Sequence, residues 1–285
     1  MKLSKPVKRT ILGSLLVPRT LSSPIRMLPD FLIIGTKRGG TTSMYNYLTA
    51  HPCIAPAFQK EPHFFDMNFK RGVNWYRAQF PSRLYQNFIE QYYGRSLITG
   101  EATPCYLFFH YHAVKRVVEF LPKIKIIALL RNPIDRAYSH YYHEVSRGNE
   151  TLSFEDAIQK EDKRTQGEWE KVLSDSNYYS YNLFHYSYLS RGIYIDQIRS
   201  WVETFTKNQI LVLKSEDLYD NPVGVYKRVI SFLGLPDFEL KNAKQWNETK
   251  YQNEMAPKTR RWLSDHFRHY NNQLYEYLGM DFHWE

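Results

Sequence analysis

The chain has 285 residues, of which 43% are hydrophobic and 24% are charged, and its formal net charge is +9. This composition is typical of a globular protein and excludes a low-complexity or fibrous chain. Two cysteines, Cys53 and Cys105, are too few for a disulfide framework, so we expect reduced thiols in a cytoplasmic protein.

Residues 1–29 form a basic segment, which we expect to be a flexible arm. It has six Lys or Arg and no Asp or Glu, and so accounts for six of the nine net charges and leaves +3 for residues 30–285. Its one apolar run, residues 11–17, is far shorter than the roughly 20 residues of a transmembrane helix. Attachment to a membrane surface or a polyanion is the alternative.

Residues 30–285 contain no linker or repeat and are predicted to form one domain. Short apolar runs at residues 31–34, 97–99, 124–130 and 209–213 alternate with helical patterns, among them 41–50, 133–147 and 257–278. This alternation predicts an α/β fold with a single P-loop-like domain, in which helices flank a central parallel sheet on both faces. Ligands of such sheets bind at the carboxyl ends of the strands.

A glycine-rich loop follows the first predicted strand in FLIIGTKRGGTTS, residues 31–43. Glycines at 35, 39 and 40 allow a tight turn, and the next helix, which Thr41 or Thr42 can cap, directs its N–H groups at the loop. The loop therefore predicts an anion site. A P-loop kinase has lysine directly before the threonine, whereas Lys37 and Arg38 lie inside this loop.

A second candidate anion site is RNPIDRAYS, residues 131–139, after the strand predicted at 124–130. A magnesium-dependent P-loop enzyme commonly has an aspartate at such a strand end, where Arg131 would repel a metal ion. Arg131 suits a second phosphate instead, and Ser139, two helical turns later, can donate its hydroxyl.

Two proton acceptors, Glu61 and His63, lie in QKEPHFFD, residues 59–66. Either can remove a proton from an attacking hydroxyl or amine. A solvated Lys-Glu pair beside two buried phenylalanines would give the same pattern, so both interpretations stay open. Residues 176–194 hold eight aromatic side chains, which indicate either an acceptor cleft, with or without a lid, or helix packing.

Together these segments resemble the sulfotransferases that use 3′-phosphoadenosine 5′-phosphosulfate (PAPS), particularly the heparan sulfate sulfotransferases and their bacterial relatives. The resemblance implies that the loop binds the 5′-phosphosulfate and that Arg131 and Ser139 bind the 3′-phosphate. In the family, the cation three residues before the first threonine contacts the transferring group; that position is Arg38 here, and Lys37 can share its role. The implied loop contacts are Lys37, Arg38, Gly39, Gly40, Thr41 and Thr42.

The resemblance also assigns roles outside the loop. It implies that Glu61 is the general base and that His63 and Asp66 lie beside the acceptor. Lys250 and Tyr251 match the end of a segment that closes over the nucleotide.

A further family segment is matched by GEATPCYLF, residues 100–108. The heparan enzymes have lysine at the position of Ala102, so its absence argues against a polyanionic sugar substrate. We expect Tyr106 and Tyr194 to contact the acceptor.

The resemblance implies a sulfotransferase that needs no metal. We expect in-line transfer to a hydroxyl or amine of a small molecule, such as a secondary metabolite or toxin, with Lys37 and Arg38 neutralising the leaving oxygen. A glycan acceptor is the alternative, and a small-molecule or nucleotide kinase is a more distant one. Nucleic-acid binding is disfavoured because most of the positive charge lies in residues 1–29 and no binding module is present.

Overall fold

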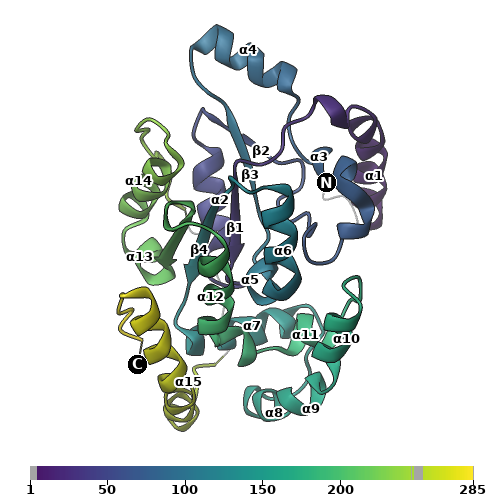
Figure 1. Cartoon of the computed structure of the whole chain (residues 1–285). Helices are drawn as coiled ribbons and strands as arrows, with labels where there is room; N and C mark the ends of the chain where they lie inside the picture. Colours follow the sequence, from purple (N-terminus) through teal and green to yellow (C-terminus); the bar gives the residue numbers. More distant parts are fainter. Residues whose placement is uncertain (1–4, 245, 247–252, 285) are drawn as a thin grey trace.

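The computed structural model describes residues 5–244, 246 and 253–284, and its centre is one five-stranded parallel sheet (Figure 1). The strand order is β2-β3-β1-β4-β5. The strands are β1 (Phe31–Gly35), β2 (Ile54–Pro56), β3 (Ile98–Ala102), β4 (Lys125–Leu130) and β5 (Ile210–Lys214).

Helices connect the strands and form the outer layers. In chain order the α-helices are α1 (Lys5–Leu21), α2 (Thr41–Thr49), α3 (Gly72–Arg77), α4 (Arg83–Tyr93), α5 (Cys105–Phe108), α6 (His110–Phe120), α7 (Pro133–Ser146), α8 (Phe154–Gln159), α9 (Glu161–Thr165), α10 (Glu168–Ser174), α11 (Tyr181–Tyr186), α12 (Tyr194–Thr204), α13 (Ser215–Asp220), α14 (Pro222–Leu233) and α15 (Pro257–Leu278). The short 3-10 helices are η1 (Ser23–Ile25), η2 (Phe69–Arg71), η3 (Ser190–Gly192) and η4 (Lys207–Gln209).

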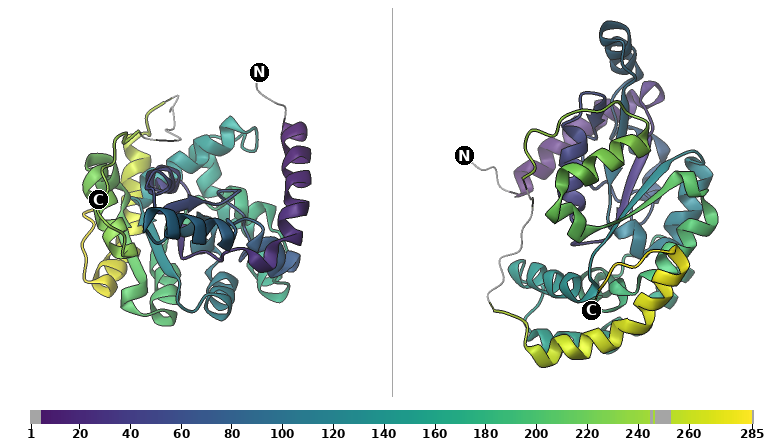
Figure 2. Two further views of the ribbon diagram at one scale, coloured as in Figure 1. Left: turned by 90° about the horizontal axis from the view of Figure 1, so that it is seen from above. Right: turned by 90° about the vertical axis from the view of Figure 1, so that its left-hand side faces the viewer.

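Both faces of the sheet are buried, as the predicted α/β architecture requires (Figure 2). Successive strand residues point to opposite faces, so Leu32 and Ile34 pack with α6 and α12. Phe31 and Ile33 pack on the other face with α2 and α14. This double coverage explains why the strands read as continuous apolar runs.

The strand order reverses at β1, which places a binding crevice at its carboxyl end. From β1 the chain passes to the edge strand β2 and back to β3 beside β1, and it then crosses to β4 and β5 on the other side. The pairing of β1 with β4 shifts register between Ile33 and Gly35, where the glycine-rich loop begins.

Most predicted elements are present, with two differences. Strand β2 was not predicted, because it has three residues and ends in Pro56. Helix α2 has Gly40 rather than Thr41 or Thr42 as its N-cap. Helix α15 lies where the pattern at 257–278 predicted it, and it buries Phe267 and Leu274 but exposes Trp262.

The basic N-terminal segment differs from the flexible arm that we expected. Residues 5–21 form α1, and the end of that helix is fixed to the domain. Arg19 donates to the carbonyl oxygens of Ala78 and Phe80, at 2.6 and 2.9 Å, and Arg26 donates to Phe80 O at 2.9 Å. Backbone carbonyls thus hold this segment in place of the acidic partners that it lacks. Across the described residues, no helix combines the length and apolar character needed to cross a membrane.

Candidate active site

The glycine-rich loop is held at the end of β1 by backbone contacts. Thr36 N donates to Leu129 O at 2.7 Å, and Ser215 Oγ donates to Gly39 O at 2.7 Å. A Cβ at Gly39 would lie 2.8 Å from Thr36 Cγ2 and 2.9 Å from Leu129 O, so only glycine fits. Gly40 has φ +84°, a left-handed conformation that leads directly into α2. The first N–H groups of α2, which have no acceptor within the helix, therefore face the loop.

The two predicted anion-binding segments, residues 31–43 and 131–139, meet at this loop. Arg38 Nε donates to Ser139 Oγ at 3.0 Å, and Arg131 Nη1 donates to Arg38 O at 3.1 Å. Ser139 is fully buried in α7, and α7 begins two residues after Arg131. The structure thus brings Arg38, Arg131 and Ser139 together at the carboxyl ends of β1 and β4.

Tyr194 holds the backbone of Arg131 in place. Its hydroxyl donates to Arg131 O at 2.8 Å, and its side chain is buried in the core. We had expected Tyr194 to contact the acceptor, but its polar atom is committed to the strand end. The helical register of α12 turns this tyrosine inward, toward the sheet.

Lys37 lies apart from Arg38, in a buried network on α7 and α11. Its Nζ is 2.8 Å from His140 Nε2, 2.9 Å from Glu144 Oε1 and 3.2 Å from Phe184 O. On the far side of Glu144, His185 Nδ1 lies 2.7 Å from Oε2. The sequence did not predict these partners, because they lie more than 100 residues from Lys37.

The charged groups of this network stabilise one another. Burial alone would raise the pKa of Glu144, but hydrogen bonds from His140 and His185 and the charge of Lys37 hold it well below its usual range. Burial lowers the pKa of Lys37 to about 8, and Arg191 lowers it while Glu144 opposes the shift. Burial, and after it the charge of Lys37, lowers the pKa of His140 far below its usual value, so this ring is neutral.

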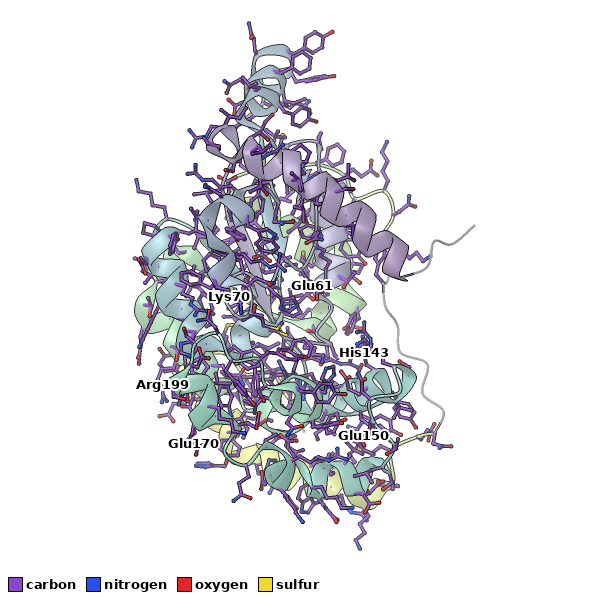
Figure 3. The ribbon with its side chains drawn as sticks, turned by 90° about the vertical axis from the view of Figure 1, so that its right-hand side faces the viewer. Glu61, Lys70, His143, Glu150, Glu170 and Arg199 are labelled. Carbon is purple, nitrogen blue, oxygen red and sulfur yellow. The ribbon has the colours of Figure 1, made fainter. Side chains whose placement is uncertain are left out.

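The predicted base segment forms a second cluster. Glu61, labelled in Figure 3, has a side chain that is 40% exposed and accepts a 2.5 Å hydrogen bond from Lys60. His63 Nε2 lies 3.8 Å from Glu61 Oε2, and its Nδ1 lies 2.8 Å from Asp66 Oδ2. Burial lowers the pKa of His63, but Asp66 and Glu61 outweigh burial, so the net shift is upward. The Lys60-Glu61 pair is present, and so is the grouping of Glu61, His63 and Asp66.

Phe184 connects the base segment to the loop. Its ring centre lies 5.9 Å from that of His63 and 4.9 Å from Lys37 Nζ. The predicted acid-base residues and the glycine-rich loop are therefore separated by one aromatic ring. This contact joins residues 37, 63 and 184, which no local pattern relates.

Glu101 is a buried polar residue that sequence reasoning missed. It accepts hydrogen bonds from Thr103 Oγ1, Tyr106 Oη and Tyr76 Oη, at 2.6, 2.8 and 3.2 Å. Burial raises its pKa to about 7, although these hydrogen bonds oppose the rise. A charged residue at the end of a buried strand was the available signal, but the predicted strand stopped at Thr99.

The structure also corrects the prediction for Tyr106. We had expected it to contact the acceptor, but it is fully buried. Its hydroxyl donates to Glu101 and accepts from Phe64 N at 3.0 Å. The strand end thereby holds the backbone between His63 and Asp66 by way of Tyr106.

The aromatic segment divides into an exposed and a buried part. Tyr178 and Tyr179 are partly exposed and line a shallow, solvent-open depression. Tyr188 and Tyr194 lie in the core. Helix packing is confirmed for the buried part of this segment, and the acceptor role of the exposed part stays a prediction. The remaining lining of the depression is Asp66, Met67, Phe109, His112, Val172, Ser176 and Ser180.

A possible metal-ligand group also lies near the base segment. One ligand atom each of His63, Asp66 and Cys105 lie within 4.8 Å of one another. Arg191 Nη1 is 3.8 Å from Cys105 Sγ, and burial raises the pKa of that thiol to about 11. A neighbouring guanidinium and a protonated thiol both disfavour a cation here. The absence of a metal requirement remains a prediction.

Lys250 and Tyr251, the predicted nucleotide contacts near the C-terminus, lie outside the described residues. The described residues on either side contact the site helices. Trp246 N donates to Ser43 Oγ on α2 at 2.9 Å, and Tyr138 Oη on α7 donates to Asn253 O at 2.7 Å.

Comparisons with known proteins agree with this geometry. Residues 28–275 match the sulfotransferase domain family. Heparan sulfate glucosamine 3-O-sulfotransferase 3B1 of Mus musculus is 29% identical, over 91% of this chain and 66% of that protein. Bifunctional heparan sulfate N-deacetylase/N-sulfotransferase 1 of Caenorhabditis elegans is 28% identical, over 82% of this chain and 25% of its own length. This chain thus spans just under two thirds of the first relative and a quarter of the second.

A solved structure is also similar. The crystal structure of a sulfotransferase from Alicyclobacillus acidocaldarius is 28% identical, with a TM-score of 0.67, and the match covers 90% of this chain and 97% of that one. The predicted fold class is therefore confirmed.

Proposed function

This chain belongs to the sulfotransferase family, and from that premise we propose that it moves a sulfuryl group from PAPS to a hydroxyl or amine of a carbohydrate acceptor. The observation that carries the proposal is the meeting of Arg38, Arg131 and Ser139 at the loop before α2. Its groups are cations, a hydroxyl and helix N–H groups, which suit a donor with one anionic group at each end.

The two ends of PAPS suit different residues of this set, which fixes the orientation of the donor. Arg131 and Ser139 bind the 3′-phosphate, and the loop from Arg38 to Thr42 receives the 5′-phosphosulfate. Arg38, rather than Lys37, is the loop cation that faces the donor, because the ammonium of Lys37 is already neutralised by Glu144. The N-terminus of α2 and the hydroxyls of Thr41 and Thr42 hold the non-bridging oxygens.

Bound PAPS supplies the sulfuryl group: a bond forms from the acceptor oxygen or nitrogen to sulfur as the bond from sulfur to the 5′-phosphate oxygen breaks. Glu61 accepts the proton of the acceptor, since its exposed carboxylate can reach solvent-borne substrates. Arg38 neutralises the charge that develops on the leaving oxygen. His63, held by Asp66, orients Glu61 and the acceptor.

The proposed acceptor differs from the small molecule that we expected from the sequence. The relatives named above act, by their names, on heparan sulfate, which favours a glycan. Ala102 supports a small-molecule acceptor as the second candidate, because it is buried and cannot offer the cation that the heparan enzymes have there.

Two experiments, calorimetry and then a transfer assay, test the proposal. Adenosine 3′,5′-bisphosphate should bind tightly with EDTA present, and ADP should bind weakly; a preference for ATP with magnesium would instead support a kinase. Transfer from radiolabelled PAPS should then be compared for N-sulfated and desulfated heparan oligosaccharides and for a phenol. Transfer to the phenol alone would replace the glycan with the small-molecule acceptor.

A further inference from the structure

Helix α4 carries its apolar face on the outside of the molecule. Leu84, Phe88 and Tyr92 recur at a spacing of four residues and are 68, 57 and 72% exposed. Tyr85 and Tyr93 widen the same face and are about half exposed. No residue from Arg83 to Tyr93 is buried. We call these five side chains the α4 apolar face.

The half-buried residues of α4 are Gln86, Ile89 and Glu90, so a mainly polar side of the helix turns toward the domain. Gln86 Nε2 donates to Leu97 O at 3.0 Å, and Glu90 Oε1 accepts from Leu97 N at 3.3 Å. A surface helix normally buries its apolar stripe and exposes its polar one. This helix does the reverse, so its own domain does not supply the partner of the apolar face.

The helix also stands at one end of the molecule. Figures 1 and 3 both show α4 projecting beyond the other elements. It lies just before β3, at the amino ends of the strands, and thus opposite the loop at Arg38. A surface bound to α4 would leave the candidate active site open.

The end of the N-terminal segment, with exposed apolar side chains, lies beside α4. Met27 N donates to Pro81 O at 2.9 Å, and Arg26 forms an isolated bridge with Ser82, directly before α4. Leu21 and Ile25, at the end of the basic segment, are exposed. Arg83 begins α4 and Arg95 follows it, and both are exposed.

We propose that this end of the protein docks on an anionic lipid bilayer, with the α4 apolar face in the headgroup region. Tyrosine, phenylalanine and leucine on one face, flanked by arginine, form the pattern of an interfacial helix. The exposed Arg83 and Arg95, at the two ends of α4, complement the negative lipid surface.

A second copy of the chain is the less suitable partner. Fully covered aromatic side chains bury about 150–250 Å² each, so the half-exposed α4 apolar face offers on the order of 500 Å². A stable interface between two proteins buries about 800 Å² on each side. A single projecting helix of this size suits insertion into lipid better than contact with a flat protein surface.

Sedimentation of the full chain with vesicles tests the proposal. We expect it to pellet with mixed phosphatidylcholine and phosphatidylglycerol vesicles, and more weakly with phosphatidylcholine alone or in high salt. The combined change Leu84→Ser, Phe88→Ser and Tyr92→Ser should lower the partition coefficient by about a hundredfold. The matched control, Asn87→Ser with Gln91→Ser, alters exposed polar positions of the same helix and should bind as the parent does.

Failure to pellet, or equal binding by the triple variant, would overturn the proposal. Equal binding to vesicles of phosphatidylcholine alone would contradict a contribution of the basic residues to docking. Analytical ultracentrifugation without lipid covers the remaining case, since self-association that the triple variant abolishes would assign the α4 apolar face to a dimer. The melting temperature of each variant establishes that it is folded.

Discussion

The proposed donor side and the proposed acceptor side of the candidate site are built in different ways. The donor side is mainly backbone: a strand end, two glycines and a helix N-terminus, with Arg38 and Arg131 added. The acceptor side consists of side chains from distant segments, such as His63, Tyr179 and Phe184. A backbone-built site appears in the sequence as a short motif, whereas a surface assembled from distant side chains leaves no local pattern.

The largest expected effect tests the acceptor side. Glu61→Gln removes the proposed proton acceptor and should lower kcat by about 10²–10⁴-fold. Binding of adenosine 3′,5′-bisphosphate, measured by calorimetry, should stay unchanged, because Glu61 lies outside the loop. Glu119→Gln, at an exposed position of α6, is the control. A Glu61→Gln enzyme with nearly full turnover would remove this residue as the base.

The next effect separates the two cations of the loop. Arg38→Ala should lower kcat by about 10²–10³-fold, and Arg38→Lys should restore most of the activity. Lys37→Met should instead lower the free energy of unfolding by about 3–5 kcal/mol, because it leaves Glu144 buried without its counter-charge. Turnover and thermal unfolding of all three variants check this division. A stable Lys37→Met protein without turnover would reverse the assignment.

A smaller effect is expected at the 3′-phosphate. Arg131→Ala removes a charge-assisted hydrogen bond and should weaken adenosine 3′,5′-bisphosphate binding by about 10–100-fold. ADP, which has no 3′-phosphate, should lose much less affinity. Equal losses for the two nucleotides would refute the assignment of Arg131.

The smallest effect on turnover is expected from Glu101→Gln, whose main effect is on stability. The pKa of Glu101 is raised from 4.5 to about 7, so the folded state holds a proton that the unfolded state releases. Its contribution to stability is therefore complete below pH 4.5 and is lost as the pH rises toward 7, by up to about 3 kcal/mol. Glu101→Gln should flatten this decline in chemical denaturation curves. The same slope in parent and variant would contradict it.

The sequence predicted the sheet, and it singled out the loop and strand-end residues that meet at the proposed donor side. The apolar runs located four of the five strands, and the loop glycines and Arg131 lie where their patterns indicated. Tyr106 and Tyr194 were wrongly expected to face the acceptor, because aromatic type alone does not reveal which side of a helix or strand end is buried. The partners of Lys37 could not be predicted from the sequence, because Glu144 and Phe184 approach it only after α7 and α11 have packed.

The network around Glu144 has a consequence for folding. Its members come from the loop after β1, from α7 and from the α11 region, and Glu144 is almost fully buried among them. An intermediate with α7 docked but the α11 region absent would bury this carboxylate with only part of its compensation, at a cost of several kcal/mol. The loop and the α11 segment should therefore form and open as one cooperative unit. Hydrogen exchange should accordingly give the amides near Lys37 and Phe184 the same opening free energy.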